Sequence, residues 1–213
     1  MNNTSFPALQ NNPSTPPVSK TRMITLIGVF AAISTILMFI EMPLPLMPPF
    51  LKIDLSGVPI LIIGFMYGPM PAIYVTIIKD LVHMLSSQTG CVGELADIIM
   101  SSCFVVPASL IYRRHKDRKS AVLSMLIGTV LMTIAGVLVN YFILIPAYQT
   151  LMNLPLEVIV GMGTKVWSYI DNTVKLVIFI TAPFNVLKGT VLSVVTYLLY
   201  KRVSPLLHQK SGR

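Results

Sequence analysis

The chain has 213 residues, of which 54% are hydrophobic and 11% charged, and its mean hydropathy is +0.75. A soluble domain carries roughly 25% charged residues, so the composition excludes an ordinary globular protein and predicts an integral membrane protein. The formal net charge of +8 lies in short clusters between apolar segments, which is typical of cytoplasmic loops, so no nucleic-acid partner is expected. No GxxxxGK[ST] phosphate-binding loop occurs, so no nucleotide-hydrolysing module is expected, and the energy for any energy-driven work comes from elsewhere.

The chain begins with a polar stretch and a first apolar segment. Residues 1–19 are rich in Asn and Pro and are expected to form a disordered cytoplasmic tail. Residues 23–41 form the first predicted span, and the proline-rich residues 42–52 then form a stiff outer loop, because proline cannot continue a helix. Small residues on this span permit close approach of another helix, either in a partner subunit or within the bundle itself: Gly28, Ala31, Ala32 and Thr35.

The next apolar segment, residues 55–78, is interrupted by Gly68-Pro69-Met70-Pro71. It is either one kinked span or two short helices that meet at a tight turn. Basic residues tend to stay in the cytoplasm, and Arg22 and the basic cluster 113–119 can both do so only if an even number of spans separates them. We therefore predict separate spans at 54–68, 70–86 and 93–112. The first of these is short for a bilayer and is expected inside the bundle.

The second half of the chain predicts two more spans. Residues 120–156 are uncharged and too long for one span, and Pro146 and the Asn153-Leu154-Pro155 turn are expected to end the fifth helix. Residues 149–171 then form an outer connection with Trp167 and Tyr169 as interfacial anchors. The last span covers 176–200. The predicted fold is an all-α integral membrane protein with six transmembrane helices and cytoplasmic N- and C-termini, comprising a membrane domain over residues 20–207 and a short tail, 208–213.

Three polar residues within the predicted spans need a physical reason. A lysine at mid-span costs about 2.5–3.5 kcal/mol on insertion scales, and Lys188 shares a helix face with Asn185 at i, i+3. Either these two side chains bind a polar ligand, or Lys188 snorkels or pairs with an acid on a neighbouring helix. Asn140 is a second buried amide, for which a hydrogen bond between helices is the alternative to ligand binding.

A second polar group follows the Gly-Pro turn. Lys79 and Asp80 form either a self-compensating pair or part of a ligand site. A metal site is not expected, because no HExxH or CxxC pattern accompanies the candidate ligands, and two of them, Glu94 and Asp97, fit equally well as acids favoured in a helix first turn. The candidates are Asp80, His83, Cys91, Glu94 and Asp97.

Four segments resemble a known family. They are Phe39–Pro59 (FIEMPLPLMPPFLKIDLSGVP), Gly64–Pro69 (GFMYGP), Asn140–Tyr148 (NYFILIPAY) and Pro183–Lys188 (PFNVLK). Together they resemble the riboflavin-specific substrate-binding subunit, or S component, of bacterial energy-coupling factor transporters. The resemblance extends from about residue 20 to 207. Its most specific parts are the proline-rich loop that leads into Lys52-Ile53-Asp54-Leu55-Ser56 and the Phe-Asn-x-x-Lys segment.

The resemblance implies a six-helix subunit in the bacterial cell membrane that captures riboflavin in a cavity open to the outside. Riboflavin is then a transported ligand and no cofactor is expected. A separate transmembrane coupling subunit and two ATPase subunits would supply movement and energy. The family's flavin-binding residues correspond to Asn140, Asn185 and Lys188, and we add Leu51, Lys52 and Lys79 as further candidates. Gly57 departs from the family, where an acidic residue is unsurprising, and Lys52 contacts either the ribityl chain or only solvent.

Alternative functions make different demands on the sequence. An S component for another vitamin, or a stand-alone permease, is the main alternative, although an ion-coupled permease usually shows internal repeats and this chain has none. An intramembrane enzyme would use Asp80, Glu94 and Asp97, but neither paired acids nor a nucleophile with a base is evident. No enzymatic activity and no catalytic residues are therefore predicted.

Overall fold

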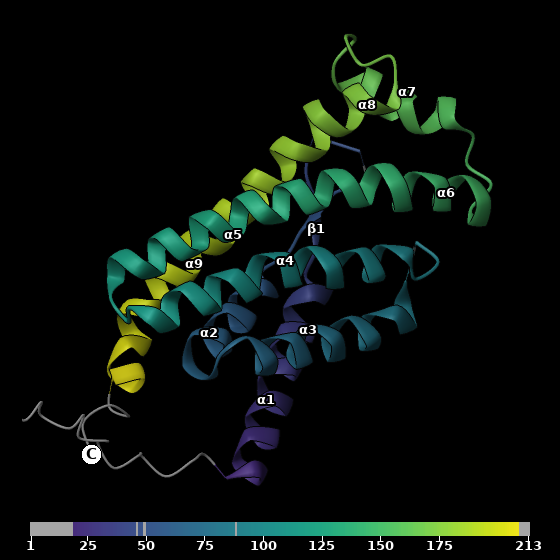
Figure 1. Ribbon diagram of the computed structural model, residues 1–213. Coiled ribbons are helices and arrows are strands. Elements are labelled where there is room, and N and C mark those ends of the chain that lie inside the picture. Colours follow the sequence, from purple (N-terminus) through teal and green to yellow (C-terminus); the bar gives the residue numbers. More distant parts are fainter. Residues whose placement is uncertain (1–18, 46, 49, 88, 209–213) are drawn as a thin grey trace, which may run out of the picture.

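The structure, a computed structural model, describes residues 19–45, 47–48, 50–87 and 89–208, with side chains up to residue 199. The expected tails, 1–19 and 208–213, lie outside this range except for Ser19 and His208. The described chain is mostly helical (Figure 1), with these elements in order: α1 (Lys20–Phe39), β1 (Met42–Pro43), β2 (Lys52–Ile53), α2 (Gly57–Tyr67), α3 (Pro69–His83), η1 (Met84–Ser86), α4 (Val92–Arg114), α5 (Arg118–Val139), η2 (Asn140–Leu144), α6 (Ile145–Leu151), α7 (Leu156–Val166), α8 (Thr173–Leu176), η3 (Val177–Thr181) and α9 (Ala182–His208).

Four helical segments in the described residues are long and apolar enough to cross a membrane. They are Lys20–Phe39, Val92–Arg114, Arg118–Leu151 and Thr173–Leu199. They agree with the first, fourth, fifth and sixth predicted spans. The remaining predicted spans correspond to α2 and α3, which are shorter.

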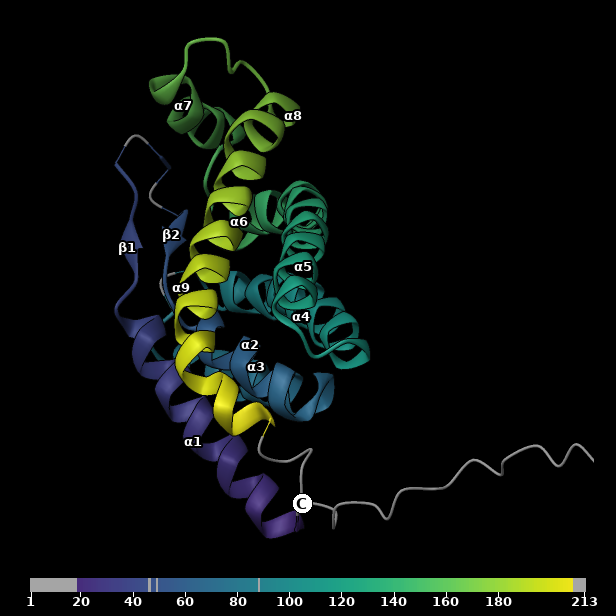
Figure 2. The same ribbon diagram turned by 90° about the vertical axis from the view of Figure 1, so that its left-hand side faces the viewer.

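The segment between α1 and α2 forms a small hairpin. β1 and β2 pair antiparallel, with Met42 opposite Ile53 and Pro43 opposite Lys52, and Figure 2 shows them beyond the end of α1, beside α9. Lys52 Nζ donates to Glu41 Oε1 across the hairpin. The sequence predicts only a stiff loop here, because its prolines cannot donate hydrogen bonds to a sheet.

The Gly68-Pro69 sequence separates α2 from α3, as expected. Gly68 has φ +99° and ψ −176°, a conformation that is essentially confined to glycine, and its N–H bonds to Gly64 O at 2.8 Å. Pro69 occupies the first turn of α3, where its missing N–H is tolerated. The 11 residues of α2 are about 16 Å long, and the helix contacts α1, α3, α4 and α9. It therefore lies inside the bundle.

The fifth helix does not end at Pro146, contrary to our prediction. Helical structure continues from Arg118 to Leu151 because a π turn, η2, precedes the proline, with Ile145 N–H bonded to Asn140 O. Pro146 then lies in the first turn of α6, the position where a helix tolerates proline. A second π turn, η3, precedes α9. The Asn153-Leu154-Pro155 turn does follow the helix end, and Asn153 has φ +49°.

The predicted outer connection, 149–171, is more ordered than a loop. It contains the end of α6 and the amphipathic helix α7, followed by an aromatic group of Trp167, Tyr169 and Phe179 with ring centroids 5.6–5.7 Å apart. Trp167 and Tyr169 are half exposed, and their role as interfacial anchors stays a prediction.

Two hydrophobic clusters divide the bundle. One surrounds α2 and includes Ile60, Leu61, Ile63 and Phe104. The other lies at the hairpin end and includes Leu51, Leu144, Tyr148, Ile159 and Phe184. This second cluster encloses the cavity described next.

Candidate functional site

A cavity of about 290 Å³ lies at the hairpin end of the bundle. Its walls come from the end of α1, the hairpin, the start of α4, η2 and α6, α7 and the start of α9. Apolar side chains such as Phe50, Leu144, Tyr148, Ile159 and Phe184 cover most of it. A largely apolar cavity with a few polar groups is typical of a small-molecule site.

Five of the six predicted ligand-binding residues line this cavity: Asn140, Asn185, Lys188, Leu51 and Lys52. Asn140 lies on η2, and Asn185 and Lys188 lie on the first turns of α9. Leu51 immediately precedes β2, and Lys52 is its first residue. Residues separated by up to 137 positions in the sequence are therefore brought together.

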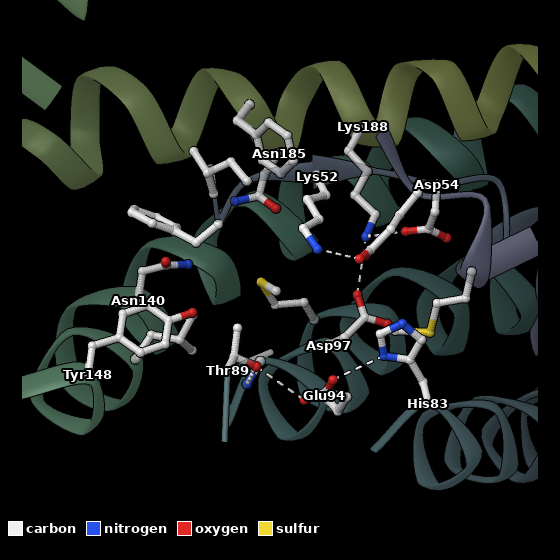
Figure 3. A pocket seen from close by; sticks show the side chains of 18 of the residues that line it. Lys52, Asp54, His83, Thr89, Glu94, Asp97, Asn140, Tyr148, Asn185 and Lys188 are labelled. Atoms are coloured by element: carbon white, nitrogen blue, oxygen red, sulfur yellow. Dashed lines mark hydrogen bonds and ion pairs between the residues drawn. The ribbon is translucent and has the colours of Figure 1, made fainter. Parts of the chain in front are cut away.

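The two amides line the same part of the cavity wall (Figure 3). Each anchors its NH₂ group on its own helix: Asn140 Nδ2 donates to Gly136 O at 2.8 Å, and Asn185 Nδ2 donates to Thr181 O at 2.9 Å. Both side chains are 3% exposed or less. Among the described residues neither amide oxygen receives a hydrogen bond, so both can accept one from a ligand.

Each amide is connected to a π turn, Asn140 directly and Asn185 through its hydrogen bond to Thr181. Asn140 is the first residue of η2, and Thr181, which holds Asn185, is the last of η3. π turns occur frequently at functional sites because the extra residue redirects side chains. The sequence contains no signal for them, since a π turn leaves the apolar pattern of a span almost unchanged.

The inner wall of the cavity carries a group of buried charges that we call the acid–lysine cluster: Asp54, Lys79, Asp80, Asp97 and Lys188. Lys188 Nζ lies 3.1 Å from both Asp54 Oδ2 and Asp97 Oδ1. Lys79 Nζ lies 2.8 Å from Asp80 Oδ1 and 2.7 Å from Asp97 Oδ2. Asp97 therefore bridges the two lysines and joins α3, α4 and α9.

The pairing explains how Lys188 is tolerated inside the bundle. The alternative stated above, an acid on a neighbouring helix, is present as Asp97 on α4, and Asp54 supplies a second carboxylate from the segment before α2. A lysine ammonium has three donors, and these acids use two of them. Among the described residues the third donor has no partner, so it is available to a molecule in the cavity that Lys188 lines, and pairing and ligand binding are compatible.

Lys79 is not a cavity residue, and its inclusion among the candidate ligand-binding residues is corrected. Its side chain is fully buried, and its three donors go to Asp80, Asp97 and Met38 Sδ, the last at 3.3 Å. The self-compensating pair with Asp80 is present, with Asp97 as an additional partner. Lys79 therefore stabilises the cavity wall and has no donor left for a ligand.

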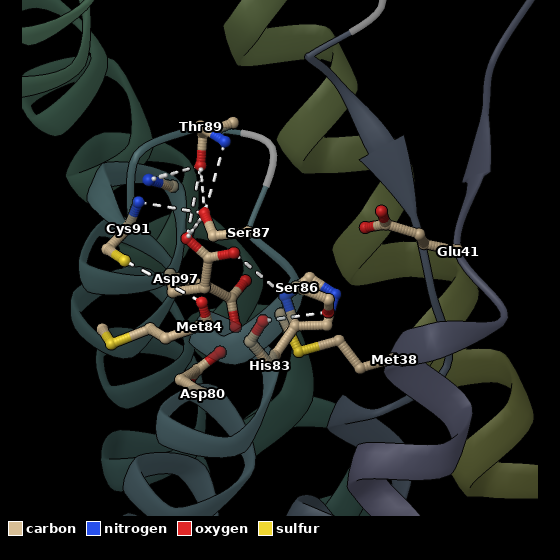
Figure 4. Close-up of polar contacts among 12 residues, drawn as sticks. Met38, Glu41, Asp80, His83, Met84, Ser86, Ser87, Thr89, Cys91 and Asp97 are labelled. Atoms are coloured by element: carbon tan, nitrogen blue, oxygen red, sulfur yellow. Dashed lines mark hydrogen bonds and ion pairs between the residues drawn. The ribbon is translucent and has the colours of Figure 1, made fainter. Parts of the chain in front are cut away.

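A second polar network borders the cavity (Figure 4). Glu94 Oε1 lies 3.0 Å from His83 Nδ1, and Glu94 Oε2 accepts from Ser87 Oγ at 2.8 Å and Thr89 Oγ1 at 3.2 Å. The network joins the end of α3 to the start of α4. Glu94 thus does more than complement the helix dipole, because it also connects His83 with Ser87 and Thr89. Sequence reasoning missed this network because its members lie on separate elements.

The small residues of α1 divide between two faces. An added Cβ at Gly28 would meet nothing within 4 Å, and Ala32 is exposed while Thr35 is half-buried. Ala31 is only 2% exposed and packs in the core. Ala31 is therefore corrected from a partner-facing residue to a bundle-packing one, and Gly28, Ala32 and Thr35 remain candidates for a partner surface.

Known proteins similar to this chain form one group. The riboflavin transporter RibU of Staphylococcus aureus (strain TCH60) is 36% identical over 87% of this chain and 92% of its own length. The riboflavin transporter FmnP of Bacillus subtilis (strain 168) is 30% identical over 90% and 96%. A solved structure described as the S component of a bacterial ECF transporter has a TM-score of 0.70 and 33% identity, and the match covers 89% of this chain and 99% of that one.

The family comparison agrees with these relatives. The model of the family described as "ECF transporter, substrate-specific component" matches residues 22–200, which include all the residues that line the cavity. The relatives are named as transporters and not as enzymes. The chain therefore belongs to the substrate-specific components of ECF transporters, which are multi-pass proteins of the cell membrane.

Proposed function

We propose that this chain captures riboflavin from outside the cell as the substrate-binding subunit of an ATP-driven vitamin transporter. The observation that carries the proposal is the convergence of two amide oxygens and a lysine donor on one largely apolar cavity. A flavin ring needs such an arrangement, because its faces are apolar and one edge carries carbonyl and imide groups. The names of the similar proteins from S. aureus and B. subtilis support the same ligand.

The proposed roles follow from the donors and acceptors that remain available. The oxygen of one of the two amides, Asn140 or Asn185, accepts from the single imide N–H, the other can accept from a ribityl hydroxyl, and the third donor of Lys188 reaches a ring carbonyl. Leu51 and Lys52 belong to the hairpin wall of the cavity, and Lys52 is already paired with Glu41. We therefore assign the hairpin to covering the ligand and the three other residues to holding its polar edge.

The test is a titration of the purified protein with riboflavin, in which binding is measured by the quenching of riboflavin fluorescence. Unrelated vitamins are tested in parallel, by their ability to displace riboflavin and by direct titration. Selective binding of riboflavin, together with yellow flavin absorbance in the protein as purified, is expected. Tighter binding of another vitamin would instead make the chain an S component for that vitamin. If the protein binds neither riboflavin nor any of the other vitamins, the proposal is rejected.

We further propose six membrane crossings with both termini in the cytoplasm. The crossings are α1, α2, α3, α4, the continuous helix of α5, η2 and α6, and the continuous helix of α8, η3 and α9. The basic residues support this topology, since Arg22, the cluster 113–119 and the C-terminal lysines and arginines then share the cytoplasmic side. Single cysteines at positions 44 and 116 test it with an impermeant reagent on intact cells. Labelling is expected at 44 only, and labelling at 116 would overturn the topology.

The energising partners follow from the family. An S component contains no ATPase of its own, so we propose a transmembrane coupling subunit and two ATPase subunits as partners. The coupling subunit is proposed to contact α1 at Gly28, Ala32 and Thr35, where small residues leave the helix surface flat.

A further inference from the structure

The two amides of the cavity meet at one glycine. Gly136 lies on the last turn of α5, one turn before Asn140, and its carbonyl oxygen accepts the hydrogen bond from Asn140 Nδ2 at 2.8 Å. Its missing side chain leaves the space that Asn185 occupies: a Cβ at position 136 would overlap Asn185 Nδ2 and lie 2.9 Å from Asn185 Cγ. A single residue thus contacts both amides, through its carbonyl group on one side and its lack of a Cβ on the other.

We propose that Gly136 is a positioning residue for ligand binding, which acts by setting where the Asn185 carboxamide lies relative to Asn140. The proposal rests on the function proposed above and adds a residue that does not line the cavity. A Cβ at position 136 moves the carboxamide, because the groups it meets are the end of the Asn185 side chain and not backbone. The displaced amide leaves Thr181 O, to which it is now bonded at 2.9 Å, and its oxygen leaves the cavity wall.

The same helix pair provides a matched control. α5 and α9 run antiparallel (Figure 1), and at their next close contact the glycine belongs to the other helix: a Cβ at Gly189 would lie 2.6 Å from Thr129 Cγ2 and 2.7 Å from Thr129 Oγ1. Neither Gly189 nor Thr129 lines the cavity. Gly189→Ala therefore disturbs the packing of α5 against α9 without touching an amide.

The first measurement is a double-mutant cycle on riboflavin affinity. Gly136→Ala is expected to weaken binding by roughly 5- to 150-fold, the loss that follows when a buried hydrogen-bonding group is misplaced. In an Asn185→Ala background the same substitution should change affinity by less than about twofold, because the group it displaces is gone. Gly189→Ala should show no such dependence on Asn185. Equal losses from Gly136→Ala in both backgrounds would overturn the proposal.

The second measurement needs no ligand. In protein labelled with ¹⁵N-asparagine, the Asn185 side-chain amide resonances are identified by their absence in Asn185→Ala. They should shift in Gly136→Ala and stay in place in Gly189→Ala. Unshifted resonances in Gly136→Ala would overturn the positioning role whether or not riboflavin binds. If the wild-type protein does not bind riboflavin but the Asn185 resonances shift in Gly136→Ala, the proposed ligand is rejected and the positioning of Asn185 by Gly136 is supported.

Discussion

Two lysines of the acid–lysine cluster have different tasks, although both lie deep inside the bundle. Lys188 lines the cavity and shares Asp97 with Lys79, which does not line it. The sequence shows that each lysine needs a partner, because a charge is costly inside a membrane. It cannot show which partner, since Lys188 and Asp97 are 91 residues apart and come together only because α5 packs against both α4 and α9.

The paired substitutions Lys188→Met and Lys79→Met separate these tasks. Lys188→Met removes a donor at the cavity and should weaken riboflavin binding by roughly 5- to 150-fold. Lys79→Met leaves Asp80 and Asp97 without their shared partner, which should destabilise the fold by about 3–5 kcal/mol, while the folded fraction keeps near-normal affinity. Fluorescence quenching on monodisperse protein gives the affinities, and thermal unfolding in detergent gives the stabilities. Wild-type affinity in Lys188→Met would leave Lys188 with a structural role only.

At the scale of elements, the breaks between helices were partly predictable. Gly68-Pro69 and Asn153-Leu154-Pro155 end helices because proline and residues at positive φ cannot continue them. Pro146 carries the same signal and yet lies within a continuous helix, because η2 precedes it. The two π turns, η2 and η3, also position the two amides of the cavity. The sequence therefore does not predict the turns that shape the cavity.

The turn between α2 and α3 should depend strictly on glycine. Gly68→Ala introduces strain of about 1–3 kcal/mol at φ +99°, and the new Cβ would lie 2.6 Å from Arg113 Nη1. The thermal unfolding midpoint should therefore fall. Gly161→Ala on α7 is the control, because its Cβ meets nothing within 4 Å and alanine favours a helix more than glycine does. Equal midpoints for the two variants would contradict this account of the turn.

The π turn at 140–144 should be necessary for binding. Deleting Phe142 removes the extra residue, and each residue of an α-helix turns the chain by about 100°. Asn140 would then point away from Tyr148 and the cavity, so riboflavin binding should fall by at least about fivefold. Phe142→Ala is the control, because this exposed side chain can be shortened without changing the helix register. Retained affinity after the deletion would show that the turn is dispensable.

At the scale of the whole molecule, the separation of α1 into two faces predicts separate effects on transport and folding. Gly28→Leu and Ala32→Leu fill the exposed face and should block assembly with the coupling subunit, while flavin binding by the isolated subunit stays near normal. Ala31→Leu overfills the core and should lower stability by about 1–3 kcal/mol. Co-purification with the coupling subunit and thermal unfolding measure the two effects. Loss of flavin binding in Gly28→Leu would place that residue in the bundle interior instead.

The overall architecture followed from the sequence more closely than the site did. Apolar length and the distribution of basic residues place the long helices, because both act through the average properties of whole segments. The division of α1 into a buried and an exposed face depends on single contacts, such as that of Ala31 with the core around α2. Such contacts follow no local pattern, so Ala31 could not be distinguished from Ala32 by sequence.

The continuous helix from Arg118 to Leu151 is longer than a bilayer requires. Its 34 residues extend about 51 Å, whereas the hydrocarbon layer is about 30 Å thick. Asn140 lies about 33 Å from the basic end of this helix. In the proposed topology, with that end in the cytoplasm and with little tilt, the amide end of the cavity would stand at the level of the outer lipid headgroups. A polar ligand of the proposed site would then reach its first contacts by diffusion through water, without entering the hydrocarbon layer.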